Sequence, residues 1–343
     1  MCAVSQPPRN ATLHDVARLA QVSLATASRV LNGSTRAVAD SYREKVQAAA
    51  AELGYTANRS AQATAKGTSA TVALLVADIA DPYFGEIAAG VASAAEELGL
   101  MVNIAMTDRD PCREIRAVRE LRGQRPRGLI LAASRTTDGD PSELKAELAL
   151  LEAAGGRAVA IGGGAPDLRS VRVDNHGGAE ALGDAMAALG YRRSIVLAAD
   201  GGIVTSDDRV AGFRTGFERA GGSVSRIYRD GLTREAGHRA MAAALADGVE
   251  KGTVVFGVTD VVALGALVAL REAGRSVGAD IAIAGFDDVP ASRDVTPNLT
   301  SVHVPLQAVG SEALRAAVDP DWSPDAAPLS VSVRVRESTP GLQ

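Results

Sequence analysis

Short hydroxyl side chains and one arginine gather near the amino end of the chain, at Ser23, Thr26, Ser28 and Arg29. Hydroxyl groups of this kind hold DNA phosphates and fix the register of a protein on the duplex. The guanidinium of Arg29 has the fork geometry that pairs with a guanine edge, and the pair Leu24-Ala25 offers apolar contact to a thymine methyl group. These residue types favour contact with double-stranded DNA.

A second group of polar and aromatic side chains comes directly after predicted strands. It consists of the run Asp81 to Phe84, Ser134 and Asp287. In open α/β sheets, ligands bind at the carboxyl ends of the strands, and between two lobes they bind in the cleft. Tyr83 and Phe84 form an adjacent aromatic pair in a chain with 3% aromatics, although ordinary packing at a helix start would also explain them.

Arg209 opens a predicted helix after an acidic run. On the surface such an arginine forms an ion pair that is worth little. Opposite a desolvated ligand, its rigid fork holds two hydroxyls or a carboxylate, with about 1.5–3 kcal/mol for each charge-assisted bond. Together with Asp287 it would suit a polyhydroxylated or similarly polar small molecule.

The elements that would position the first group are two short helices within residues 12–32. Thr12 and Asp15 have the spacing of a capping box, and Ser23 is a good N-cap for the second helix. Leu13, Val16, Ala17 and Ala20 recur at helical spacing, and Ala27, Val30 and Leu31 would pack back against them. The pattern is that of a helix-turn-helix, with a bland helical hairpin as the alternative.

A third helix is predicted over residues 40–53, with Tyr42, Val46, Ala49, Ala50 and Leu53 on one side. Residues 58–65 could form a further short helix, or a solvated tether, before the linker Gly67-Thr68-Ser69. From Thr71 onwards, strand-like runs alternate with amphipathic helical stretches, which argues for parallel sheets covered on both faces. The predicted strands are Val72–Val76, Met101–Ala105, Gly128–Ala132, Ala158–Ile161, Ser194–Leu197, Thr253–Phe256 and Ile281–Gly285.

The charge of the chain is divided unevenly. Residues 1–69 hold 8 Lys/Arg and 4 Asp/Glu, a balance of +4, so the remaining 28 Lys/Arg and 37 Asp/Glu give residues 70–343 a balance of −9. Repulsion between that acidic part and DNA is screened over roughly 8 Å at physiological salt. The amino-terminal segment is therefore the candidate DNA contact.

Other function classes receive little support. No apolar run reaches the length of a membrane span, and the first ten residues lack the apolar region of a secretory signal, which favours the cytoplasm. The two cysteines, Cys2 and Cys112, are expected to be free thiols. The four histidines are scattered and no zinc or nucleophile motif occurs, so we expect no metal, no cofactor and no catalysis.

Residues 12–65 closely resemble the DNA-binding headpiece of the LacI/GalR family of bacterial transcription regulators. The matching residues include Val22-Ser23, Ser28 to Asn32, Leu53-Gly54-Tyr55 and Asn58-Arg59. The resemblance also implies DNA contacts by Thr12, Asn32, Asn58, Ala61 and Thr64. In this family, residues 58–65 would be a hinge helix that enters the minor groove with an inserted leucine. Thr64 stands at the place of that leucine and is too small and polar for a full wedge, so we expect a weaker kink.

The rest of the chain resembles the ligand-binding core of the same family, which shares its fold with periplasmic sugar-binding proteins. Marks of this resemblance are Asp81 to Phe84, Asp208-Arg209, Asp260 and Gly285 to Asp288. It implies an α/β core of two parallel-sheet lobes, the first at about residues 71–170 and 301–320 and the second at about 171–300. The effector cleft between them would be lined by Asp81, Tyr83, Phe84, Ser134, Arg209, Thr259 and Asp287.

The organisation predicted is therefore a tail at 1–11, a helix-turn-helix domain at 12–56, a hinge and linker at 57–70 and an effector-binding and dimerisation core at 71–343. The expected function is that of a homodimeric repressor that binds a near-palindromic operator and a small polar effector, most simply a sugar or sugar derivative. A solute-binding protein without DNA function, or an enzyme acting on a sugar or nucleoside, would share the two-lobed core. The first alternative would need a signal peptide and would have no use for residues 12–65, and the second would need a catalytic base in the cleft and would turn over its ligand.

Overall fold

The structure is a computed structural model, and it describes residues 11–31, 38–56, 70–132, 140–162, 168–323 and 328–342. The chain divides into two compact units, Met1–Ala70, called the head below, and Thr71–Gln343, called the core. No helix in the described ranges is long and apolar enough to cross a membrane.

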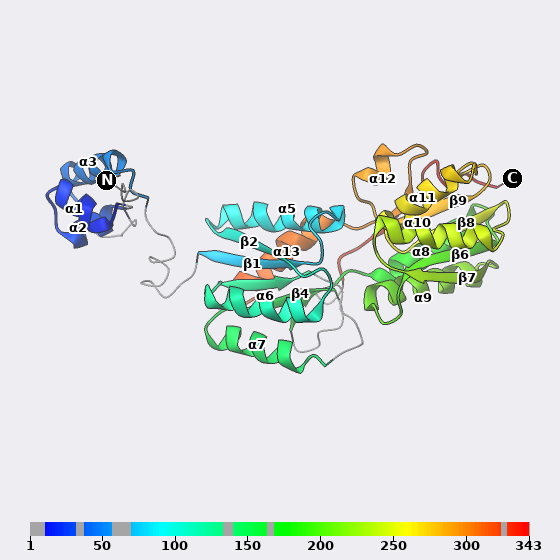
Figure 1. Cartoon of the computed structure of the whole chain (residues 1–343), viewed down its shortest axis with the longest axis horizontal. Coiled ribbons are helices and arrows are strands. Elements are labelled where there is room, and N and C mark those ends of the chain that lie inside the picture. Colours follow the sequence, from blue (N-terminus) through cyan, green and yellow to red (C-terminus); the bar gives the residue numbers. More distant parts are fainter. Residues whose placement is uncertain are drawn as a thin grey trace, which may run out of the picture. The chain divides into compact units, whose positions relative to one another are not determined.

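The head contains three described helices (Figure 1): α1 (Leu13–Leu19), α2 (Leu24–Leu31) and α3 (Asp40–Glu52). The predicted capping box is present, because the amide of Asp15 donates to Thr12 Oγ1 (3.3 Å) and the amide of Thr12 donates to Asp15 Oδ2 (3.0 Å). The amide of Thr26 donates to Ser23 Oγ (3.1 Å), so Ser23 caps α2 as predicted. Both caps satisfy amides that the first turn of a helix leaves without partners.

The core of the head is small and is made mostly of alanine. Tyr42, predicted to face this core, is instead 48% exposed. It stands in the first turn of α3, whereas the buried stripe of that helix begins one turn later at Val46. The buried side chains are Val16, Ala17, Ala20, Ala27, Val46, Ala49 and Ala50.

The first lobe of the core is a five-stranded parallel sheet in the order β2-β1-β3-β4-β5. Its strands follow the runs of apolar residues predicted from the sequence, with the short β5 added at one edge. The elements are β1 (Thr71–Val76), α5 (Pro82–Glu97), β2 (Met101–Met106), α6 (Pro111–Gly123), β3 (Gly128–Leu131), α7 (Ser142–Ala153), β4 (Ala158–Ile161) and β5 (Arg169–Val171).

Helices cover both faces of this sheet. α5 packs against α13 (Leu306–Val318) on one face and α6 packs against α7 on the other (Figure 1). The strand period of two explains why: Leu74 of β1 belongs to the cluster under α5, while Leu75 belongs to the cluster under α6 and α7. α5 and α13 approach so closely that a Cβ at Gly90 would overlap the backbone of Gln307.

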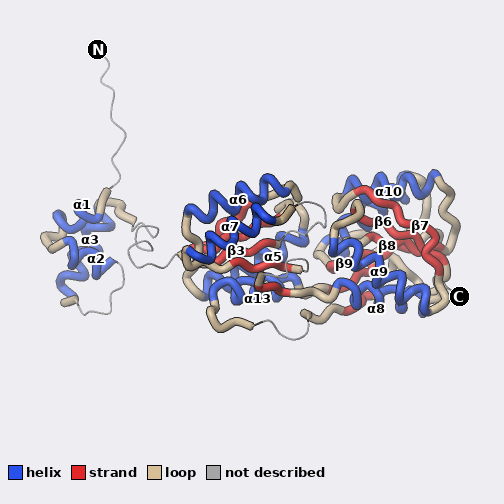
Figure 2. The backbone as a smooth tube through the Cα atoms, turned by 90° about the horizontal axis from the view of Figure 1, so that it is seen from below, coloured by secondary structure: helices blue, strands red, loops and turns tan. Residues whose placement is uncertain are grey.

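The second lobe is a six-stranded sheet in the order β11-β10-β9-β8-β6-β7, parallel except for β11. α8 and α9 pack together on one face of it, and Figure 2 shows α10 on the opposite face. α11 packs against α10. The elements are α8 (Asn175–Ala188), β6 (Arg193–Ala199), α9 (Val204–Arg219), β7 (Ser223–Asp230), α10 (Arg234–Ala246), β8 (Thr253–Gly257), α11 (Asp260–Glu272), β9 (Ala282–Asp287), α12 (Ala291–Asp294), β10 (Thr300–His303) and β11 (Ser332–Arg334).

The chain passes between the lobes in three places, and the second passage differs from the predicted return at about residue 301. β10 pairs with β9 in the second sheet, from Thr300 opposite Ala284 to His303 opposite Asp287. The return to the first lobe therefore consists of α13, which follows directly after β10. β11 then brings the chain back to the second sheet by pairing with β10. The two-lobed α/β fold itself is confirmed.

Candidate functional site

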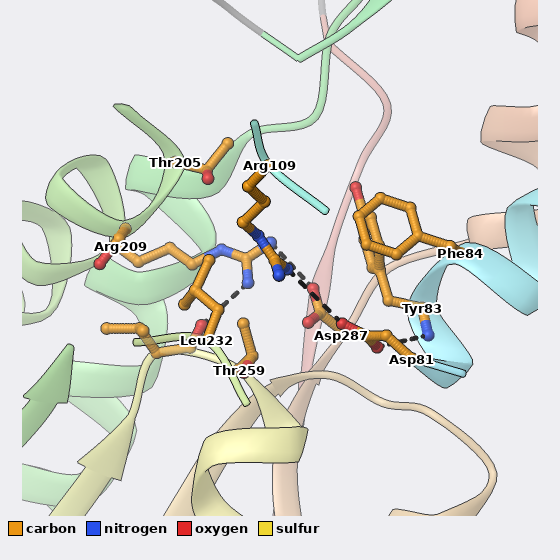
Figure 3. Close-up of a pocket in the computed structure, with 11 residues that line it drawn as sticks. Asp81, Tyr83, Phe84, Arg109, Thr205, Arg209, Leu232, Thr259 and Asp287 are labelled. Carbon is orange, nitrogen blue, oxygen red and sulfur yellow. Dashed lines mark hydrogen bonds and ion pairs between the residues drawn. The ribbon is translucent and has the colours of Figure 1, made fainter. Parts of the chain in front are cut away.

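A polar pocket lies between the two lobes of the core, where the carboxyl ends of both sheets meet (Figure 3). Six of the seven predicted effector residues line it, and the seventh, Ser134, lies outside the described residues. Five further lining residues were not predicted. The lining consists of Asp81, Tyr83, Phe84, Arg109, Thr205, Ser206, Arg209, Leu232, Val258, Thr259 and Asp287.

Arg209 is held rigidly in the first turns of α9 and is 5% exposed. Its Nε donates to Asn175 Oδ1 (2.9 Å) and its Nη1 donates to the carbonyl oxygen of Val258 (2.8 Å). Its Nη2 lies 2.8 Å from Asp287 Oδ1, and its guanidinium lies 3.9 Å from the ring centroid of Phe286. All three nitrogens thus have protein partners, so the guanidinium is fixed in place before any ligand arrives.

Asp287 ends β9 and is 2% exposed. Its backbone has a φ of 107°, which non-glycine residues rarely adopt and which costs about 1–3 kcal/mol. Burial raises the pKa of Asp287 to about 7, although Arg209 acts in the opposite direction. A strained backbone and a raised pKa on a residue facing a pocket indicate a functional role.

The first lobe contributes the start of α5. Asp81 accepts a hydrogen bond from the amide of Tyr83 (3.0 Å) and so caps the helix, with Pro82 as its first residue. The rings of Tyr83 and Phe84 meet edge to face, with centroids 5.0 Å apart. Phe84 is 2% exposed and belongs to the hydrophobic core. It therefore packs in the core and also lines the pocket. Burial raises the pKa of both Asp81 and Tyr83.

Thr259 caps α11 by accepting from the amide of Val262 (3.2 Å), and the next residue, Asp260, is fully buried. Asp260 accepts from Ser301 Oγ (2.6 Å) and from the amide of Val289 (2.8 Å), and burial raises its pKa. These bonds tie the loop after Asp287 to α11 and β10. Asp260 is therefore a structural support of the pocket rather than one of its lining residues.

The sequence contains two pairs of adjacent carboxylates, Asp207-Asp208 and Asp287-Asp288, and their members bind different partners. Asp207 accepts from the amide of Gly202 (2.9 Å) at the start of α9. Asp288 accepts from Arg336 Nη2 (2.6 Å) and from Ser292 Oγ (3.1 Å), away from the pocket lining. Among the residues that the structure describes, no group of three or more metal-ligating side chains comes together.

The lining residues that were not predicted differ in whether the sequence contains a signal for them. Arg109 follows β2, so the rule that located Asp81 after β1 would also have indicated it. Thr205 and Ser206 lie in the first turn of α9, just before Arg209, and Ser206 Oγ accepts from the amide of Ala199 (3.1 Å). Leu232 and Val258 are apolar, and no chemical signal distinguishes them in the sequence from other core residues.

The head places several predicted DNA contacts on its surface. Leu24, Ala25 and Arg29 are exposed on α2, and the two cap residues, Ser23 before α2 and Thr12 before α1, are exposed as well. Thr26 and Ser28 are partly buried on the same helix. Asn32, Asn58, Ala61 and Thr64 lie outside the described residues. The exposed side of α2 is the surface that a recognition helix would present to a major groove.

Two known families match the chain. Bacterial regulatory proteins of the lacI family match residues 12–58, and a periplasmic binding protein-like domain matches residues 184–339. Similar proteins include the HTH-type transcriptional regulators CelR of Thermobifida fusca and GalR of Escherichia coli K12. CelR is 33% identical over 321 residues, covering 91% of this chain and 92% of CelR. GalR is 31% identical over 312 residues, covering 90% of this chain and 88% of GalR.

Solved structures show the same relationship. The lac repressor dimer bound to its operator and the anti-inducer ONPF has a TM-score of 0.83 and 28% identity, covering 97% of this chain and 100% of that one. A complex of the regulator CelR with cellobiose has a TM-score of 0.67 and 31% identity, covering 96% of this chain and 99% of that one.

Proposed function

The chain belongs to the LacI family of bacterial regulatory proteins, and from this premise we propose that it is a repressor that binds a near-palindromic operator as a homodimer and answers to a small polar effector. The observation that carries the proposal is the presence in one chain of a capped helix pair with an exposed α2 and of a polar pocket between two lobes. A protein that acts on operator DNA works in the bacterial cytoplasm, where we place this chain.

The chain is a regulator rather than an enzyme. Relatives that match about nine tenths of its length are transcriptional regulators. A solute-binding protein would share the two lobes but would have no use for the head. In our proposal, effector binding in the pocket alters operator affinity through the hinge and linker at 57–70, of which residues 57–69 lie outside the described residues. Coupling of this kind is typically worth about 1–3 kcal/mol.

We propose a sugar or sugar derivative as the effector class. The pocket presents two carboxyl groups, two guanidinium groups and two threonine hydroxyls beside aromatic and apolar walls. Such a mixture suits a ligand with many hydroxyls, because each hydroxyl both donates and accepts. The similarity to CelR, whose structure holds cellobiose, supports the same class.

The edge strand β2 offers a surface for dimerisation. Met101, Ile104 and Met106 of this edge strand are each about half exposed, as is Leu98 at the carboxyl end of α5. Exposed apolar side chains on an edge strand are normally covered by a partner. We expect Ile104→Asp to sediment as a monomer at concentrations where the parent protein is a dimer. Leu150→Asp, on the equally exposed Leu150 of α7, is the matched control and should stay dimeric; a monomeric parent protein would contradict the proposal.

Arg29 is the side chain on α2 that we expect to contact a guanine. Arg29→Ala should cost about 1–3 kcal/mol of operator affinity and relax base preference at one position in each half-site. Binding to a set of single-base operator variants measures both effects. Glu44→Ala, exposed on α3, is the control and should leave the base preference unchanged. Equal weakening on every sequence would show that Arg29 does not contact a base.

The test of the proposed function is retention of genomic DNA. The purified chain is incubated with sheared DNA of its own host at moderate salt, and the retained fragments are sequenced. We expect enrichment of one or a few palindromic sites, whose neighbouring genes would point to the effector pathway. Failure to enrich any site, with and without small molecules from a cell extract, would reject specific DNA binding.

A further inference from the structure

The pocket contains two arginines whose hydrogen bonding differs sharply. Arg209 uses all three of its nitrogens on protein atoms, as described above. The guanidinium of Arg109 donates no hydrogen bond to any residue that the structure describes, and its Nε is buried without a partner. The nearest carboxylate oxygen, Asp81 Oδ2, lies 3.9 Å from Arg109 Nη2, which is an ion pair but not a hydrogen bond.

The backbone holds Arg109 in this position. Asp108 and Arg109 both adopt left-handed conformations, with φ of 51° and 57°, directly after β2. The amide of Asp108 donates to the carbonyl of Ala77 (2.9 Å), and Asp110 then caps α6 by accepting from the amide of Cys112 (2.8 Å). Two consecutive left-handed residues between such fixed points form a specific turn. Its effect is to turn the side chain of Arg109 into the cleft rather than along the sheet.

Figure 3 shows the guanidinium of Arg109 in the middle of the cleft, with Phe84 on one side and Arg209 on the other. It lies 6.0 Å from the ring centroid of Phe84 and is 26% exposed. A buried N–H donor that lacks an acceptor costs free energy, and among the described residues the Nε of Arg109 is such a donor. The geometry therefore leaves a place for an acceptor that a ligand would bring.

Arg109 also lies where two cavities meet. The inner pocket beside Arg209 has about 30 Å³, whereas an outer cavity of about 380 Å³ is lined by Asp78, Asp81, Arg109 and Arg234, among others. Only the outer cavity falls within the range of ordinary small-molecule sites. A ligand in the outer cavity that also reaches toward Arg209 would pass directly beside Arg109.

The remaining charges indicate what such a ligand carries. Arg209 and Asp287 form an ion pair at 2.8 Å, whereas the described carboxylates that act on Arg109 are Asp81, at 3.9 Å, and Asp78. Arg109 shares the outer cavity with a second arginine, Arg234. Asp78, Asp81 and Glu235 line the same cavity and accept hydroxyl donors well. A hydroxyl gives an arginine one bond, whereas a carboxylate or phosphate gives two parallel charge-assisted bonds.

We propose that the effector is a polyhydroxylated acid, a sugar bearing a carboxylate or phosphate group, and that Arg109 is the specificity-determining residue that binds its acidic group. This inference rests on the proposed function, since it names the class of effector for the same cleft. Hydroxyls of the ligand form hydrogen bonds with the carboxylates and threonines of the cleft, while the acidic group pairs with the guanidinium of Arg109.

The test is calorimetric binding of matched sugars to the full chain. Each set holds a neutral hexose and its acids: glucose with glucuronate, gluconate and glucose 6-phosphate, and galactose with the corresponding compounds. We expect at least one acid to bind about 10-fold or more tightly than its neutral parent. The carboxylate and phosphate members of each set show which acidic group is preferred.

Substitution at Arg109 decides whether this residue is the cause. Arg109→Gln should weaken binding of the preferred acid by about 10–100-fold while changing the neutral parent by less than about 3-fold. Arg109→Lys keeps the positive charge but loses the bidentate guanidinium, so its affinity for the preferred acid should lie between those of the parent protein and Arg109→Gln. Arg116→Gln, exposed on α6, is the matched control. Thermal unfolding of each variant shows whether it is folded.

Three results would overturn the inference: neutral parents that bind as tightly as their acids, acid binding that Arg109→Gln leaves intact, or no binding by any member of the panel. Its failure is distinguishable from failure of the proposed function. A neutral sugar that releases the operator would reject the acidic effector and keep the regulator. Binding of an acidic sugar by a chain that retains no genomic fragment would keep the acidic ligand and reject the regulator.

Discussion

Operator binding should weaken by about 10³-fold or more when salt rises from about 50 to 200 mM. The expectation follows from a dimer whose two heads neutralise at least six phosphates, because each neutralised phosphate releases condensed counterions. The head supports this with a balance of +4 over residues 1–69, whereas residues 70–343 carry −9 and cannot supply the contacts. Binding isotherms on one enriched operator fragment at four or five salt concentrations give the slope.

Arg29→Ala separates phosphate contacts from base contacts in this experiment. A base contact releases no counterion from the backbone, so the variant should bind more weakly at every salt concentration while keeping the slope of the parent protein. A nearly flat salt response of the parent protein would mean that the head does not lie on the DNA backbone. Our assignment of the contact to residues 12–65 would then be wrong.

Arg209→Ala should abolish the effector response and lower the free energy of unfolding by about 3–5 kcal/mol, because it leaves Asp287 buried without its counter-ion. Asn175 Oδ1 and the carbonyl of Val258 lose their donors in the same step. Chemical denaturation measures the stability, and operator release by an identified effector measures the response. Arg214→Ala removes an arginine from the exposed side of the same helix and should cost no more than about 0.5 kcal/mol.

The loss in Arg209→Ala should depend on pH. Burial already raises the pKa of Asp287 to about 7, and removing Arg209 removes a lowering influence, so the pKa in the folded variant should rise further. A carboxyl group whose folded pKa exceeds its unfolded pKa binds more protons when folded, so stability falls as pH rises from about 4 through the folded pKa. The variant should therefore be closer to the parent protein at pH 5 than at pH 8. A difference that is the same at both pH values would show that Asp287 carries no buried charge.

Much of the fold follows from local sequence patterns. The predicted strands in β1, β2, β3, β4, β6, β8 and β9 are confirmed, since buried parallel strands are continuous apolar runs. β7 was missed because it is an edge strand whose sequence, SVSRIYRD, alternates polar and apolar residues and contains two arginines. The capping box at Thr12 was predicted correctly because a cap depends only on residues three apart.

Features that depend on distant segments were harder to predict. β10 lies in the second sheet because it pairs with β9, and nothing within Thr300–His303 indicates which lobe it would join. The position of Arg109 after β2 could be read from the sequence, but its place in the cleft depends on the left-handed turn there and on lining residues from the other lobe. Asp81, Tyr83, Arg209 and Asp287, which the resemblance assigned to the effector cleft, line the pocket between the lobes, and their contact with an effector stays a prediction.

Occupancy of the cleft and binding of the operator should be coupled in one chain. The most direct measurement is operator affinity with and without saturating effector, together with effector affinity with and without operator. Linkage requires the two ratios to be equal, and we expect each to lie at about 5–150-fold. Operator affinity that stays the same when the cleft is saturated would show that the two sites are not coupled, even if both ligands bind.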